Sequence, residues 1–131
     1  MRCRALILIA MLLATTSCSY HYAIAAVEQA GKIVFLPKDE KGTGCFSDFS
    51  VQAEGGPVVW ELSIGRYLPP PCDNKFPITY GAVPAGMTEK VKAVPLQAGT
   101  IYVIEGWDGD SYSGRFRFKR SIVIDNLPEQ R

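Results

Sequence analysis

Histidine is almost missing from this 131-residue chain, since His21 is the only one. Cysteine is scarce too, and none of the four cysteines has the Cys-x-x-Cys spacing of a redox or zinc motif. The Gly-x-Ser-x-Gly sequence of serine hydrolases and the Gly-rich loops that bind phosphates are also absent. The chain therefore lacks the residue patterns that nucleophilic catalysis, zinc binding and nucleotide binding usually require. We expect a protein that is not an enzyme and that has no catalytic residues, cofactor or metal.

The chain has little net charge of either sign. Without Arg2 and Arg4, twelve Lys and Arg residues stand against thirteen Asp and Glu residues. A nucleic-acid-binding protein would need a basic patch or stripe. The densest basic run alternates with apolar residues and fits the solvent-exposed face of one strand: Arg115, Arg117, Lys119 and Arg120. We therefore expect no nucleic-acid partner.

The longest apolar run is short and lies near the start of the chain, at residues 5–14. Arg2 and Arg4 precede it, and small residues follow it up to Cys18. A basic start, about ten apolar residues and a small-residue exit are typical of a secretory signal, which is too short to span a membrane. The sequence therefore predicts an exported protein.

Two cleavage positions compete. Cys18 directly after Ser17 resembles the bacterial lipoprotein signal, which implies that residues 1–17 are removed and that Cys18 is lipidated. Ser19 after the cysteine then implies a periplasmic protein anchored at the outer membrane. The alternative is ordinary cleavage after the Ala-x-Ala sequence at residues 23–25, which gives a secreted, soluble protein.

Cys45 and Cys72 remain after either cleavage. An even pair of cysteines in an oxidising compartment is expected to form a disulfide.

Residues 32–126 show the pattern of a β domain. Apolar and polar residues alternate over residues 58–64 and 112–119, and Gly and Pro separate seven or eight such short segments. This pattern predicts one all-β domain, an antiparallel sandwich. Residues 18–31, which include His21, show no clear periodicity and are interpreted as a tether, and residues 127–131 as a C-terminal tail.

The segment Leu96–Ile104 (LQAGTIYVI) resembles the L-x-P-G-T-x-Y-x-V stretch of fibronectin type III and other immunoglobulin-like domains. This resemblance implies an immunoglobulin-like sandwich. It also implies that Tyr102 forms a tyrosine corner, with its hydroxyl bonded to upstream backbone, and that Trp60 is the buried core indole.

The strongest candidate binding surface is the expected hairpin tip at residues 106–114. Its proposed contact residues are Trp107, Asp108, Asp110 and Tyr112. Rigid aromatic side chains beside acids are typical of recognition loops. The alternative is an Asp-Gly turn whose Trp107 folds back over the core. A second candidate surface combines Arg66, Tyr67 and Pro69–Pro71, although these prolines could merely block a sheet edge.

The signal, the size and the cysteine pair together resemble those of short bacterial lipoproteins described as immunity proteins of type VI secretion. The resemblance implies a tethered inhibitor that binds an incoming toxin or another envelope protein. Two other roles stay open. One is a carbohydrate or peptidoglycan module in which Trp107 stacks on a sugar, and the other is an accessory subunit of an envelope complex.

Overall fold

The protein is all-β in the computed structural model, which describes residues 20–39, 45–65, 71–120 and 124–129. Its strands are β1 (His21–Gln29), β2 (Lys32–Pro37), β3 (Asp48–Ala53), β4 (Val58–Ser63), β5 (Ile78–Thr79), β6 (Thr88–Val91), β7 (Ile101–Trp107), β8 (Ser111–Phe118) and β9 (Ile124–Leu127). The described residues contain no helix that is long and apolar enough to cross a bilayer.

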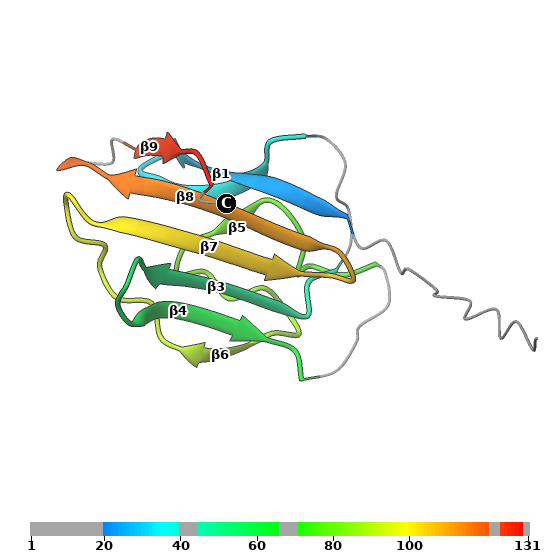
Figure 1. The fold of residues 1–131 in the computed structure, drawn as a ribbon. Helices are drawn as coiled ribbons and strands as arrows, with labels where there is room; N and C mark the ends of the chain where they lie inside the picture. Colours follow the sequence, from blue (N-terminus) through cyan, green and yellow to red (C-terminus); the bar gives the residue numbers. More distant parts are fainter. Residues whose placement is uncertain (1–19, 40–44, 66–70, 121–123, 130–131) are drawn as a thin grey trace, which may run out of the picture.

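These strands form one mixed nine-stranded sheet in the order β5-β2-β1-β8-β7-β3-β4-β6, with β9 also paired to β8. The sheet curls into a half-barrel, so that β2 and β5 lie behind β8 and β7 in Figure 1. The expected two-sheet antiparallel sandwich is therefore wrong, because strand β1 joins the two groups of strands. Its residues 21–23 pair in parallel with β8, and residues 24–29 pair antiparallel with β2.

The change of partner along β1 takes place over Gly114 of β8. A Cβ atom at Gly114 would lie 2.3 Å from the carbonyl oxygen of Ile24, which is far inside contact distance. Glycine is therefore required where the backbone of β1 crosses β8. Ile24 itself is 1% exposed and belongs to the core.

The tether predicted for residues 18–31 is wrong from His21 onward, because residues 21–29 form a central strand. The start of the predicted C-terminal tail is also built into the sheet, because Leu127 is the last residue of β9. The Asn126 side chain on β9 accepts from the Ala26 amide (2.8 Å) and donates to the Ala26 carbonyl (2.9 Å). Two residues after Asn126, the carbonyl of Pro128 accepts a hydrogen bond from the Arg115 guanidinium (3.2 Å). Both chain ends of the described fold thus meet at β8.

Aromatic side chains fill the concave side of the sheet. Phe35 of β2 lies 5.4 Å from Phe49 of β3 and 5.9 Å from Phe116 of β8, centroid to centroid, although neither strand is its neighbour in the sheet. Trp60 is fully buried, as predicted, and donates to Glu89 (3.1 Å). The hydroxyl of Tyr102 accepts from the Gln97 amide (2.8 Å), so the local tyrosine-corner contact is present although the sandwich is not.

The predicted disulfide between Cys45 and Cys72 is present, with the Cα atoms 6.0 Å apart. It holds the segment before β3 to the segment before β5. Next to it, the Phe46 amide donates a hydrogen bond to the Asn74 carbonyl (2.7 Å). The fully buried Asn74 side chain donates in turn to the Phe46 carbonyl (2.5 Å).

Candidate functional site

The four predicted contact residues do not form one exposed surface. Trp107, the last residue of β7, is 45% exposed and points outward, whereas Tyr112 on β8 is only 2% exposed. The ring of Tyr112 stacks on Tyr22 at 5.1 Å and packs edge-on against Phe46 at 5.3 Å. Burial, followed by the neighbouring Asp108 carboxylate, raises the pKa of the Tyr112 hydroxyl well above its ordinary value. Tyr112 is thus a core residue and cannot contact a partner directly.

Asp108 and Asp110 hold the turn between β7 and β8 and the start of β1. The Asp108 carboxylate accepts from the Asp110 amide (3.0 Å), and the Asp110 carboxylate accepts from the Tyr20 amide (3.1 Å). The Ser111 amide then donates to the Tyr20 carbonyl (3.0 Å). Both aspartates therefore have structural partners, and Trp107 is the predicted residue that stays available on the surface.

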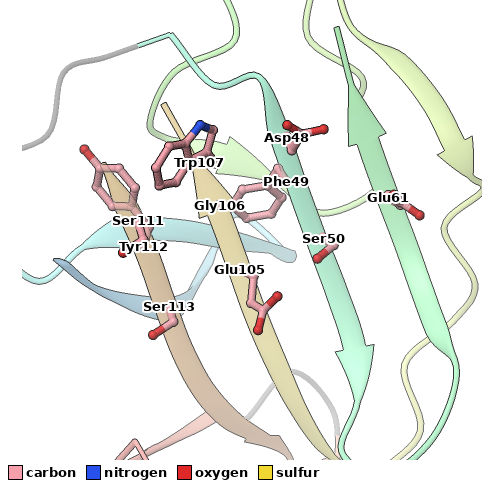
Figure 2. A pocket seen from close by; sticks show the side chains of 10 residues that line it. All are labelled: Asp48, Phe49, Ser50, Glu61, Glu105, Gly106, Trp107, Ser111, Tyr112 and Ser113. Atoms are coloured by element: carbon pink, nitrogen blue, oxygen red, sulfur yellow. The ribbon is translucent and has the colours of Figure 1, made fainter. Parts of the chain in front are cut away.

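A groove of about 330 Å³ lies beside Trp107 on the outer face of β4, β3, β7 and β8. Side chains that alternate with the core positions of these strands line it: Asp48, Ser50, Glu61, Glu105, Trp107, Ser111 and Ser113. Figure 2 shows the carboxylates on three neighbouring strands, with the indole of Trp107 at one end. The strands place these side chains in register, since Trp107 is opposite Asp48 and Ser111, and Glu105 is opposite Ser50 and Ser113.

The groove is acidic. Within the described part of the chain, none of its three carboxylates, those of Asp48, Glu61 and Glu105, forms an ion pair. Glu61 and Glu105 are both opposite Ser50, so two strand spacings, about 10 Å, separate their backbones. The described residues contain no group of three or more His, Cys, Asp or Glu side chains placed to hold one metal ion. The groove thus presents separate carboxylates on three neighbouring strands.

A second hollow of about 450 Å³ lies on the other side of Trp107, near the disulfide. It shares Asp48 and Trp107 with the acidic groove, and Ile64 and Cys45 contribute apolar surface. The indole of Trp107 is therefore a ridge between two depressions. An exposed aromatic ridge in such a position provides contact area to a ligand that fills either hollow.

His21 borders the acidic groove, which sequence reasoning missed. Its Nδ1 lies 3.0 Å from the Ser111 hydroxyl, and its Nε2 lies 2.9 Å from the Ser113 hydroxyl and 3.1 Å from the Glu129 carboxylate. Ser113 also donates to Glu129. Partial burial raises the pKa of Glu129, but the hydrogen bonds from Ser113 and His21 outweigh it, so the net shift is downward. This cluster ties Glu129, the last described residue, to β1 and β8.

The interpretation that His21 lies in a tether outside the domain was therefore wrong, and a serine, a histidine and a glutamate do meet here. The two ring nitrogens of His21 are, however, each hydrogen-bonded to a serine hydroxyl, one from Ser111 and one from Ser113. The Ser113 hydroxyl also donates directly to Glu129. The half-exposed histidine is held in place by this network. The arrangement can orient groups and exchange a proton, and it joins two chain ends.

The neighbouring part of the same outer face differs in charge balance. The Arg115 guanidinium bonds to both carboxylate oxygens of Glu54, at 2.5 and 2.9 Å. This hydrogen bonding lowers the pKa of Glu54 and raises that of Arg115. A paired charge thus lies farther along β8, whereas the carboxylates beside Trp107 have no ion-pair partner in the part of the chain that the structure describes. The difference makes the groove the strongest candidate for binding.

The period-two pattern could have revealed part of this groove. In the sequence of β3, Asp48 and Ser50 alternate with Phe49 and Val51, which predicts that the polar residues share one face. The register between β3 and β7, which brings Glu105 opposite Ser50, depends on long-range pairing and cannot be read from a local pattern. Of the second predicted surface, Arg66, Tyr67, Pro69 and Pro70 lie outside the described residues, as does Cys18, and Pro71 is exposed.

Comparison with family models, curated proteins and solved structures gave no match to this chain.

Proposed function

We propose that this chain is an exported, lipid-anchored, non-enzymatic binding protein of the bacterial envelope, and that its acidic groove binds a basic segment of a partner protein. The observation that supports this proposal is the set of three carboxylates beside the exposed Trp107 that form no ion pair with any described residue. Opposite charges guide association and fix the orientation of a complex, and a central aromatic residue supplies apolar contact. An incoming toxin with a basic surface would be such a partner, in keeping with an immunity role.

The position of β1 supports lipidation of Cys18 over cleavage after Ala25. Cleavage after Ala25 would remove the whole ladder between residues 21–23 and β8, together with the buried Ile24. Losing Ile24 alone would cost about 2–3 kcal/mol of apolar burial. Cleavage before Cys18 leaves every described residue in the protein. The disulfide agrees with an oxidising, extracytoplasmic compartment.

The anchor is tested by the intact mass of the full-length gene product extracted from membranes. A mature chain that begins at a diacylglyceryl-modified Cys18 is expected. The variant C18S should lose its membrane association and keep its fold. A native mass that starts at Ala26, or that carries no lipid on Cys18, would contradict the anchor and leave the groove hypothesis standing.

The binding surface is tested by capturing partners from solubilised envelope with the native protein and with the double variant D48N/E105Q. This variant removes two groove charges and leaves the core unchanged. A matched control is D39N/D73N, which removes two exposed carboxylates elsewhere. Binding to a stoichiometric partner should fall at least about tenfold in the groove variant, stay unchanged in the control, and weaken in high salt.

Equal capture by all three proteins would contradict the groove as the contact surface. For a candidate toxin, the purified toxin replaces the envelope extract, and protection of cells by the native gene is compared with protection by D48N/E105Q. If both genes protect the cells equally, an immunity role would not depend on this groove.

A carbohydrate is the second candidate ligand. Trp107 stands beside carboxylates and the hydroxyls of Ser50 and Ser111, and sugar-binding sites also combine an aromatic face with such groups. Titration of Trp fluorescence with soluble peptidoglycan fragments distinguishes the two ligands. A saturable change that W107F abolishes would support the carbohydrate, whereas a flat response together with a basic protein partner would exclude it.

A further inference from the structure

We propose that the end of the sheet that bears Tyr20 and Trp107 rests on the membrane surface, so that the acidic groove begins at the bilayer. The inference depends on the lipid anchor at Cys18 proposed above. It adds a second partner to the protein, a lipid surface, and a fixed orientation on that surface.

The first argument is the length of the chain between lipid and fold. Only Ser19 separates Cys18 from Tyr20. Tyr20 is already fixed to the turn between β7 and β8, because its amide donates to Asp110 and its carbonyl accepts from Ser111. Two residue steps of extended chain reach about 7 Å. A lipid on Cys18 would therefore keep this end of the sheet within a side-chain length of the headgroups.

The second argument is the chemistry of the same end. Tyr20 is 64% exposed and Trp107 is 45% exposed, and both belong to the end where β1 begins and the β7–β8 turn lies (Figure 1). Tyr and Trp side chains favour the headgroup region, where the ring contacts apolar chains and the polar atom stays hydrated. The other large exposed apolar residues described, Val83 and Val94, flank β6 at the opposite edge of the sheet order.

The third argument concerns charge and sets the kind of lipid. The turn at this end carries Asp108 and Asp110, and Asp48 lies opposite Trp107. Carboxylates are repelled by the negative potential of anionic lipids. The contact therefore suits an uncharged, zwitterionic surface such as phosphatidylcholine or phosphatidylethanolamine, and an anionic lipid should weaken it.

The orientation has a consequence for the groove. Trp107 and Asp48 form the row of side chains nearest the lipid, and Glu105, Ser50 and Glu61 form the next row along the strands. A protein partner must then approach along the membrane surface to reach these carboxylates. Partners that are themselves bound to or inserting into the bilayer are favoured over soluble ones.

The test uses the lipidated full-length protein in phosphatidylcholine vesicles with brominated acyl chains, which quench nearby Trp fluorescence. The protein contains two tryptophans, and the fully buried Trp60 serves as the internal reference. We expect quenching in the native protein and little in W107F. A Gly/Ser insertion of about twelve residues between Ser19 and Tyr20 should reduce the quenching, because it lengthens the tether to about 20 Å.

Replacing about a third of the lipid by phosphatidylglycerol should reduce quenching as well. Equal quenching in native and W107F proteins, or none in either while both float with the vesicles, would overturn the orientation and leave the anchor intact. Failure to float, together with a mass that lacks lipid, would overturn the anchor and this inference with it.

Discussion

The carbonyl oxygen of Ile24 lies where the side chain of any residue other than glycine at position 114 would begin, 2.3 Å from an ideal Cβ. This contact is the point at which β1 stops pairing with β8 and starts pairing with β2. The single sheet exists because β1 continues through it. Gly114 therefore leaves the space that β1 needs to link the two groups of strands into one sheet.

Replacing this glycine should therefore be costly. In G114A the new methyl group meets backbone atoms that cannot rotate away, so β1 must move and its pairing with β8 must weaken. We expect a loss of about 1–3 kcal/mol in the free energy of unfolding, in the range of overpacked cores. Urea unfolding followed by Trp fluorescence measures it. R117A, an outward-facing change on the same strand, is the control and should change stability by less than about 1 kcal/mol.

The start of the folded chain gives a second prediction. A chain that begins at Tyr20 keeps all of β1, whereas a chain that begins at Ala26 lacks the residues that pair with β8 and the buried Ile24. We expect the first to unfold cooperatively and the second to be unfolded or aggregated. Circular dichroism and size-exclusion chromatography of both, refolded with the disulfide oxidised, compare them. Equal cooperative unfolding would show that β1 is dispensable up to Ala25.

Local patterns predicted individual strands far better than the way they assemble. Trp60, Tyr102 and the Cys45–Cys72 disulfide were assigned correctly. The burial of Trp60 and the hydrogen bond of Tyr102 follow from nearby sequence. The disulfide follows from an even pair of cysteines in an oxidising compartment. The half-barrel was missed because it depends on β1, a segment whose small residues, such as Ala23 and Ala26, obscure the alternation.

The candidate site was predicted only in part, for a related reason. Trp107 could be placed on a hairpin end, but alternation alone does not say which face of a strand is buried, so Tyr112 was assigned to the surface in error. His21 and Glu129 are 108 positions apart in sequence and meet because β1 and β9 both pair with β8. Contacts of this kind follow from tertiary structure and leave no local signal.

The opposite environments of Trp107 and Tyr112 predict opposite effects of the same truncation. Y112A removes a ring that packs against Tyr22, Phe46 and Phe76, and should cost about 3–5 kcal/mol. W107A removes a half-exposed indole and should cost less than about 1 kcal/mol. Urea unfolding followed by circular dichroism measures both. A similar loss in the two variants would mean that Trp107 covers the core and is not available for recognition.

Acid should destabilise the protein through Glu54 and Glu129. The pKa of Glu54 is lowered by its hydrogen bonds with Arg115, and the pKa of Glu129 is lowered by Ser113 and His21 despite partial burial. A carboxyl whose pKa is lower in the folded state stabilises the fold above its unfolded value of about 4.5, and that contribution is lost as pH falls through the folded value. The free energy of unfolding should therefore decrease progressively below about pH 4.5.

Variants separate this effect from general acid unfolding. E54Q keeps the size of the side chain but cannot titrate, so its stability should be lower than that of the native protein at pH 7 and should approach it at low pH. D39N, at an exposed position, should follow the native curve throughout. Thermal unfolding from pH 3 to pH 7 gives the three curves. If the difference between E54Q and the native protein stayed constant over that range, the Arg115–Glu54 pair would not be the source of the acid dependence. The acid-dependent loss that remains in E54Q should include the release of Glu129 from His21 and Ser113, because protonation of Glu129 weakens its hydrogen bonds with both side chains.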